Sequence, residues 1–248
     1  MRDLEVQLSI SDDIIIGTDI NKNVSFPIPT SLQLIKQNKM ADPLTVCHHR
    51  GNTYLGSRKG SVVRIDADDK VTPLFACSRM IISIRAKENR LFVLLSGKPH
   101  TVCVYDLYGR LDTSWNHADF DNGYHYWNRL LLSNNQVVIA DRRKQLIVIY
   151  SERGNVEKRI SCPYIGANNR YVLCETGQSS VILTNSDQSK VFKLNLTSGE
   201  VEWTCTEIPN PEGVLCYARD YVIVFNRTGQ ERNWILNQKT GTSVEGGS

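Results

Sequence analysis

The stretch Arg129–Ile160, RLLLSNNQVVIADRRKQLIVIYSERGNVEKRI, decides the fold. It contains four short apolar runs separated by polar turns, which we expect to be strands at 130–133, 136–140, 146–150 and 155–160. Runs of about five apolar residues bounded by Asn, Asp and Gly are typical of an antiparallel meander. Because one such sheet cannot bury both of its faces, it needs similar sheets beside it.

The same pattern recurs along the chain with a period of roughly 40–45 residues, a spacing typical of propellers and solenoids. Consecutive apolar residues at 137–139 and 222–224 indicate strands that are covered on both faces. We therefore predict an all-β fold, a β-propeller of about six four-stranded blades in a single domain over residues 1–248. The six units are expected at about 4–37, 44–76, 80–115, 129–160, 171–206 and 213–245.

Glycine marks the expected turn from the third strand to the fourth in the last four units, at Gly109, Gly154, Gly199 and Gly241. Glycine is favoured there because a tight turn often requires a positive φ. The first two units lack this glycine and are the weaker copies. The last unit ends in a thin fourth strand at 242–245, which residues 4–10 could complete; alternatively, the chain is a fragment of a larger propeller.

Seven apolar residues in the expected inner strands are predicted to be buried: Val138, Ile139, Val148, Ile182, Leu183, Val222 and Ile223.

Composition narrows the class of protein. The chain has 248 residues, of which 41% are hydrophobic, and a net charge of +3, too small for a histone-like protein. No apolar run approaches the roughly 18 residues of a membrane helix, and the N-terminus has no signal-peptide stretch. The seven cysteines form no Cys-x-x-Cys pair, which argues against a zinc site or a redox pair. We expect a cytoplasmic protein with buried, reduced thiols and no membrane contact.

Catalytic signatures are missing from the sequence. His48 and His49 alternate across a strand and cannot chelate one metal together. His117 and His125 flank the acidic loop Asp119–Asp121, which we expect to be a solvated connection and not a metal site. There is no Gly-x-Ser-x-Gly elbow and no phosphate-binding loop. We therefore expect a non-enzymatic protein with no cofactor, no metal and no small-molecule substrate.

Binding is better supported, because basic residues gather in the loops between second and third strands. In a propeller, these loops and the blade connections emerge on one face. The candidate partner-binding residues in these loops are Arg58, Lys59, Lys98, Arg142, Arg143, Lys144, Lys190 and Arg227. Acids are fewer in the same loops, so this face should be basic and attract phosphates or acidic peptides.

The longest blade connection, Thr113–Asn128, is expected on the same face and is rich in aromatic residues. Its candidate partner-binding residues are Trp115, Tyr124, Tyr126 and Trp127. Aromatic rings beside Arg and Lys suit base stacking in single-stranded RNA or hot spots of a protein interface. The alternative is that Tyr126 or Trp127 packs into a blade junction.

One unit resembles a known repeat. The segment VVIADRRKQLIVIYSERGNV resembles an NHL repeat, with matching residues at Val138, Ala140, Asp141, Val148, Tyr150 and Gly154. The segment VFKLNLTSGEVEW also resembles the repeats of quinoprotein-type propellers, and the general pattern is that of WD-like repeats. The NHL resemblance implies the C-terminal propeller of a TRIM-NHL protein, although no RING, B-box or coiled coil is present in this sequence.

The resulting hypothesis is a monomeric platform for protein partners, the substrate-recognition end of a TRIM-NHL-like ubiquitin ligase. The alternative is a reader of single-stranded RNA on the basic loops. Because RNA-binding propellers should be strongly basic and the net charge is only +3, the balance favours a protein partner.

Overall fold

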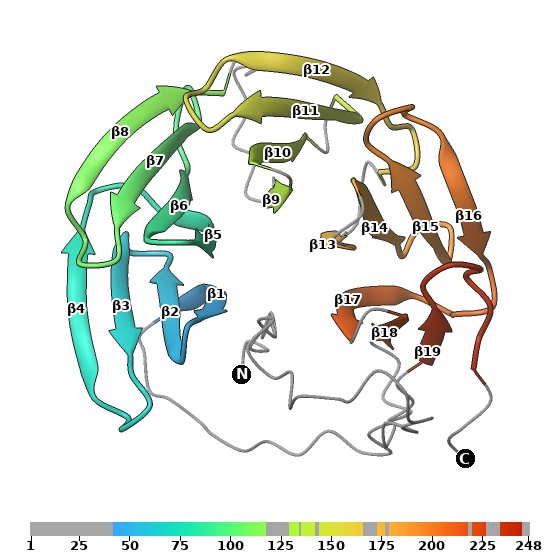
Figure 1. The fold of residues 1–248 in the computed structure, drawn as a ribbon, viewed down its shortest axis with the longest axis horizontal. Helices are drawn as coiled ribbons and strands as arrows, with labels where there is room; N and C mark the ends of the chain where they lie inside the picture. The colour runs from blue at the N-terminus through green and yellow to red at the C-terminus, as the bar shows by residue number, and fades with distance from the viewer. Residues whose placement is uncertain are drawn as a thin grey trace, which may run out of the picture.

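The computed structural model describes residues 42–117, 129–133, 135–141, 144–165, 173–176, 179–217, 220–226 and 234–244. These residues form five antiparallel sheets, which follow one another around a common centre (Figure 1). The first strand of each sheet lies nearest the centre and the last lies at the outer rim (Figure 1). The fold is therefore an all-β propeller.

The blades are formed by consecutive strands. The first contains β1 (Pro43–His49), β2 (Asn52–Ser57), β3 (Ser61–Ile65) and β4 (Val71–Ala76). The second contains β5 (Ile81–Lys87), β6 (Arg90–Leu95), β7 (Thr101–Asp106) and β8 (Leu111–Asn116). The third contains β9 (Arg129–Ser133), β10 (Gln136–Asp141), β11 (Leu146–Ser151) and β12 (Val156–Ser161). The fourth contains β13 (Leu173–Glu175), β14 (Ser180–Asn185), β15 (Lys190–Asn195) and β16 (Val201–Cys205). The fifth contains β17 (Pro211–Tyr217), β18 (Tyr221–Asn226) and β19 (Trp234–Asn237).

The prediction of about six four-stranded blades needs correction. The described residues form five blades, and the fifth has three strands. The segment after β19 pairs too briefly to make a strand, because it contributes only the bridge Leu236–Ser243 and two flanking backbone hydrogen bonds. The expected unit at 4–37 and the closing segment 4–10 lie outside the described residues.

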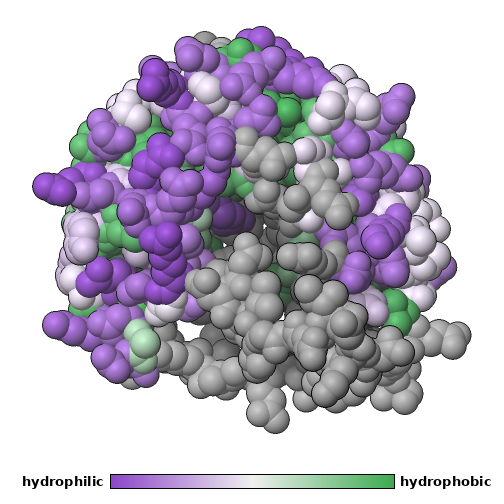
Figure 2. Space-filling view, in the orientation of Figure 1, coloured by the Kyte–Doolittle hydropathy of each residue, from purple (hydrophilic) through white to green (hydrophobic). Residues whose placement is uncertain are grey.

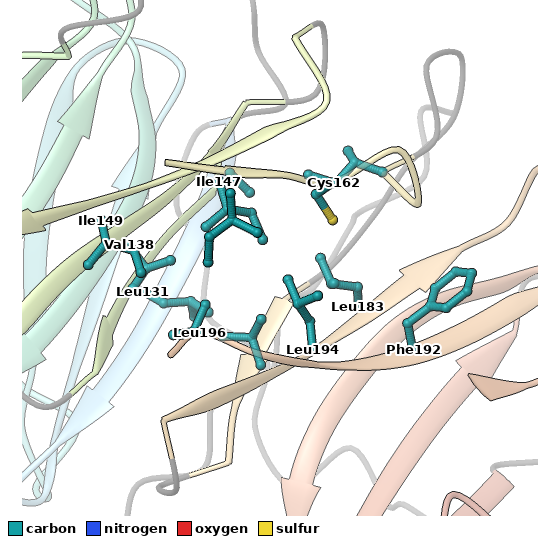
Figure 3. Close-up of a cluster of buried hydrophobic side chains, with 13 residues drawn as sticks. Leu131, Val138, Ile147, Ile149, Cys162, Leu183, Phe192, Leu194 and Leu196 are labelled. Atoms are coloured by element: carbon teal, nitrogen blue, oxygen red, sulfur yellow. The ribbon is translucent and has the colours of Figure 1, made fainter. Parts of the chain in front are cut away.

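The core lies between the blades, and alternate residues of one strand face different neighbours. Val137 and Ile139 pack toward the second blade, whereas Val138 and Ala140 pack toward the fourth. Figure 3 shows the junction of the third and fourth blades, where Val138 and its neighbours lie opposite the side chains of β14 and β15. The consecutive apolar residues of β10 are therefore covered on both faces of the sheet, as predicted. All seven predicted core residues are confirmed, with at most 2% exposure.

The predicted glycine turns are also confirmed. Gly109, Gly154, Gly199 and Gly241 all have φ between 71° and 87°. In the first blade, Asp69 takes this place with φ 67°, which Asp tolerates better than most residues. That unit therefore lacks the glycine but keeps the turn.

The outer strands pack against these turns. The fourth strand of each four-stranded blade lies against the glycine turn of the next blade. The contacts pair Leu74 with Gly109, Trp115 with Gly154, Ile160 with Gly199, and Trp203 with Gly241. Each rim strand therefore fixes the position of its neighbour's turn.

Candidate functional site

The two ends of the blades form two faces of the propeller. We call the face with the second-to-third-strand turns (58–60, 96–100, 144–145 and 186–189) and the blade connections the loop face. The opposite face, with the first-to-second and third-to-fourth turns, is the hairpin face; its turns include 66–70, 88–89, 107–110 and 152–155. On the side drawn in Figure 2, the blades present mostly hydrophilic side chains, as expected for a solvent-facing propeller surface.

The described basic residues of the predicted binding set do lie together on the loop face. Arg58, Lys59, Lys98 and Lys144 are exposed there, and Lys190 at the start of β15 is half-buried. Lys59 forms an exposed ion pair with Asp42 at 3.7 Å. The predicted residues Arg142, Arg143 and Arg227 lie outside the described residues, as do Tyr124, Tyr126 and Trp127.

The turn that carries Lys98 is held rigidly by Arg79 from the preceding blade connection. The guanidinium donates to the Pro99 carbonyl at 2.6 Å and to Thr101 Oγ1 at 2.8 Å, and it also donates to the Ser96 carbonyl. Arg79 is therefore committed to structure, whereas Lys98 is presented to solvent.

Trp115 has a structural position. It lies in the rim strand β8, where its ring packs against Tyr150 with centroids 4.6 Å apart. The indole also covers Gly154 in the turn of the third blade. Its proposed role in partner binding stays a prediction, but the ring is already engaged at a blade junction.

His117 lies just before the acidic loop Asp119–Asp121, which we expect to be a solvated connection and which lies outside the described residues. The side chain is buried between the second and third blades, where His117 Nδ1 and the Tyr150 hydroxyl share a hydrogen bond. His117 Nε2 lies 3.6 Å from Asp141 Oδ2, a carboxylate that is also buried. The backbone N–H of His117 donates to the His100 carbonyl at 2.9 Å. These polar contacts anchor the end of β8 beneath the loop face.

An open cleft lies on the hairpin face, where sequence reasoning placed no site. It has a volume of about 710 Å³ and lies between β8 and the turns of the third blade. Its lining residues are Arg90, Asp112, Thr113, Asn135, Ser151, Glu152 and Arg153. A second hollow of about 340 Å³ adjoins it and shares Arg90 and Asp112.

An ion-pair network forms the floor of the larger cleft. Arg90 Nη2 lies 2.5 Å from Glu152 Oε2, and Lys87 Nζ lies 3.5 Å from the other oxygen of Glu152. The Arg90 guanidinium also lies 5.5 Å from the centroid of the Phe92 ring. Asp112 and Arg153 have opposite charges and no hydrogen-bond or ion-pair partner among the described residues.

Two large side chains are exposed beside the smaller hollow. Tyr108 is 75% exposed and Leu111 is 57% exposed. They flank Arg110, which is bonded to Asp106. Hydrogen bonds from the backbone N–H and the guanidinium of Arg110, and from the backbone N–H of Tyr108, hold the pKa of Asp106 below its usual range. This turn therefore has a fixed backbone and presents apolar side chains to solvent.

One sequence signal could have indicated this surface. The turn segment Asp106–Leu111, DLYGRL, places Tyr and Leu around a glycine that forces a tight turn. Apolar residues at the tip of such a turn have no core to enter. The cleft itself brings together turns of two blades and required the three-dimensional structure.

Neither a metal-ligand cluster nor a membrane-spanning helix is found in the described part of the chain. No group of three or more His, Cys, Asp or Glu side chains there could hold a metal ion. No helix there is long and apolar enough to cross a membrane.

Comparisons with known proteins extend the fold assignment. Neither a protein-family model nor a curated protein matches the sequence. Among solved structures, a protein of unknown function from Bacteroides caccae is 11% identical, with a TM-score of 0.60 and coverage of 82% of this chain and 80% of that one. The WD40 β-propeller domain of Doa1 is 14% identical, with a TM-score of 0.60 and coverage of 83% and 69%. A chain of the mitotic checkpoint complex is 14% identical, with a TM-score of 0.63 and coverage of 81% and 64%.

At these identities the comparisons establish the fold alone. The chain is a β-propeller with WD40-like structural neighbours, and the assignment to NHL repeats is not established by a family match.

Proposed function

We propose that this propeller is a non-enzymatic platform that binds protein partners. The observation that carries the proposal is the exposure of Tyr108 and Leu111 beside the smaller hollow of about 340 Å³, which adjoins the cleft of about 710 Å³ on the hairpin face. Exposed aromatic and aliphatic side chains next to a hollow are typical of the energetic centre of a protein interface. A rigid β-scaffold with such a surface suits recognition of a partner.

The structural neighbours support the same class of function. One neighbour is a WD40 domain, and another belongs to the mitotic checkpoint complex, a multi-protein assembly. Because a shared fold does not establish a shared function, these similarities add support but do not choose the partner.

A narrower proposal concerns the parent protein. The NHL-like residues of the third blade support a role as the substrate-recognition end of a TRIM-NHL-like ubiquitin ligase. Val138 and Ala140 lie in β10, and Val148 and Tyr150 lie in β11, in the order that the repeat expects. We further propose that the domain is a cytoplasmic monomer, in keeping with free thiols at six described cysteines.

A second candidate function is binding of single-stranded RNA on the loop face. It is favoured by the exposure of Arg58, Lys59, Lys98 and Lys144 on that one face. Basic side chains around a groove attract a phosphate backbone, with affinity that falls as salt rises.

Two matched variants separate these functions. The hairpin variant replaces Tyr108 and Leu111 with Ser, and the loop variant replaces Arg58, Lys59, Lys98 and Lys144 with Ala. Each is compared with the wild type in affinity capture with quantitative mass spectrometry, and in fluorescence anisotropy with a randomised single-stranded RNA pool across a salt series.

If the platform proposal is right, specific protein partners are captured by the wild type and the loop variant but lost with the hairpin variant. Salt-sensitive RNA binding that only the loop variant loses would instead establish RNA reading. Equal capture of the same proteins by the wild type and the hairpin variant would contradict the role given to Tyr108 and Leu111.

A further inference from the structure

Among the outer strands of the four-stranded blades, β8 is the most exposed. Every residue from Leu111 to Ser114 is exposed, and so is Asn116. In β4, β12 and β16, exposed residues alternate with covered ones along most of the strand. Only Trp115 of β8 reaches inward, toward the third blade. Along most of its length β8 therefore faces solvent and not a neighbouring blade.

The edge of β8 also has little protection against pairing. Natural sheets block their edges with proline or with runs of charge, because an open edge pairs with other strands. β4 contains Pro73, and β12 contains the charged run Glu157–Arg159. β8, with the sequence LDTSWN, contains neither proline nor lysine, and its one charge is Asp112.

The backbone of β8 has hydrogen-bonding groups to offer. His117 N–H donates to His100 across the β7–β8 pair, and Asn116 and Ser114 follow in register opposite Thr101 and Cys103. Along an antiparallel pair, residues whose N–H and C=O groups bond to the partner strand alternate with residues whose groups point away from it. Because His117 bonds across this pair, the N–H and C=O groups of Asn116 and Ser114 point away from β7. Since β8 is the last strand of its sheet, these groups lie at the open edge.

Side-chain contacts are available alongside this edge. Asp112 and Thr113 of β8 line the larger cleft, and Arg153 lies across it. Exposed Tyr108 and Leu111 lie at the start of the strand. The unpartnered charges, Asp112 and Arg153, are of opposite sign, and the other charges of the cleft, Arg90 and Glu152, neutralise each other. Because the charges that line the cleft balance, the cleft does not attract a polyanion such as a nucleic acid. It is complementary to a polypeptide that carries charges of both signs.

We propose that β8 binds an extended peptide of a partner protein, which adds to the second blade as a fifth strand. Main-chain hydrogen bonds to Ser114 and Asn116 supply affinity, as in other cases of strand addition. Specificity comes from an apolar residue against Tyr108 and Leu111, a basic residue near Asp112 and an acidic residue near Arg153. This inference builds on the proposed protein-binding function and identifies the kind of partner and its place.

A proline substitution tests the backbone contact directly. Ser114→Pro removes an N–H that points to solvent, so it should block an added strand and leave the β7–β8 pairing intact. The matched control is Thr204→Pro in the outer strand β16. Exposed Thr204 lies opposite Phe192, the third residue of β15, and Ser114 lies opposite Cys103, the third residue of β7, so the two positions are equivalent in their blades. Thermal melting of both variants establishes that each is folded.

The probe is a set of peptides selected from a phage-displayed random library on the full wild-type chain. Their affinities are measured by anisotropy for the wild type, Ser114→Pro, Thr204→Pro and Asp112→Asn. We expect Ser114→Pro to weaken binding at least about tenfold and Thr204→Pro to leave it within about twofold. Asp112→Asn should weaken the peptides that contain a basic residue.

Three results would overturn the inference, and they have different meanings. Selected peptides that bind all three variants as they bind the wild type would remove β8 as the site while leaving the platform function intact. Failure to select any peptide with an affinity better than about 100 µM would count against both the strand-addition site and the proposed protein-binding function. A Ser114→Pro variant that self-associates less than the wild type, with no peptide selected, would identify a second copy of this chain as the occupant and reject the partner peptide.

Discussion

The indole of Trp115 lies directly against the backbone of Gly154. A Cβ atom placed on Gly154 would stand 2.3 Å from Trp115 Cγ, far inside van der Waals contact. Gly154 also has φ 86°, a conformation that residues with a side chain rarely adopt. The glycine is therefore required for two independent reasons, the shape of the turn and the closeness of the neighbouring rim strand.

We accordingly expect Gly154→Ala to lower the free energy of unfolding by about 2–4 kcal/mol, from backbone strain and displacement of the indole together. The control is Gly51→Ala, because Gly51 has φ 71° but no atom within 4 Å of the added Cβ. This control should cost only about 1–2 kcal/mol. Denaturant unfolding of both variants measures the difference, and equal losses would show that the contact with Trp115 is unimportant.

Tyr150 joins the third blade to the end of β8 through His117. The ring is fully buried, and Tyr150→Phe would leave His117 Nδ1 buried without its partner. We expect a loss of about 1–3 kcal/mol in unfolding free energy. Tyr54→Phe is the control, since that ring is equally buried and its hydroxyl has no hydrogen-bond partner among the described residues. If chemical denaturation gives Tyr150→Phe and Tyr54→Phe the same free energy of unfolding, the hydrogen bond between Tyr150 and His117 does not contribute to stability.

The core between blades should respond strongly to truncation. Ile182 is completely buried at the junction of the fourth and fifth blades, and Ile182→Ala should cost about 2–4 kcal/mol through lost contacts and a cavity. Val71→Ala at a 55% exposed rim position should change stability by less than about 0.5 kcal/mol. Urea titration monitored by tryptophan fluorescence distinguishes the two, and a small effect at Ile182 would argue against a tightly packed junction.

Much of the fold could be predicted because propeller strands carry local signals. In the third blade, the expected strands 130–133, 136–140 and 146–150 each match an observed strand to within one residue at either end. The alternation of Val137 and Val138 between two neighbours follows directly from the two-residue period of a strand. The first blade is expected from the sequence to be a weaker copy of the repeat because it lacks the turn glycine. Asp69 adopts the same positive φ at that position, so the turn forms without a glycine.

The candidate site was harder to predict, because it depends on residues distant in sequence. Nothing in the sequence indicates that His117 is buried, because its contacts are with Tyr150 and Asp141 in the next blade. Likewise, Asp112 and Arg153 belong to different blades, and their place in the lining of one cleft, near the contact of Trp115 with Gly154, comes from the packing of the two blades. The loop-face charges could be grouped from sequence because one topological rule assigns all of those turns to the same face.

The pH dependence of stability should reflect the Lys193–Glu202 pair. Lys193 is buried in β15, and its Nζ lies 2.9 Å from Glu202 Oε2. Partial burial tends to raise the pKa of Glu202, but hydrogen bonds from Lys193, Ser180 and Asn195 outweigh it and lower that pKa below the usual value of 4.5. Because the pKa is lower in the folded state, the contribution of Glu202 is fully present above the unfolded-state pKa. It is lost as the pH falls through the folded-state value.

Glu202→Gln should remove this pH dependence. At pH 7 the variant should be less stable by about 1–3 kcal/mol, because Lys193 keeps a buried charge without a charged partner. As the pH falls below about 4.5, the wild type should lose stability more steeply than the variant, so the two unfolding free energies converge. Glu200→Gln is the control, since exposed Glu200 makes no ion pair among the described residues and should leave the pH profile unchanged. Parallel profiles for the wild type and Glu202→Gln, measured by urea unfolding from pH 7 to pH 3, would show that Glu202 does not titrate with a depressed pKa.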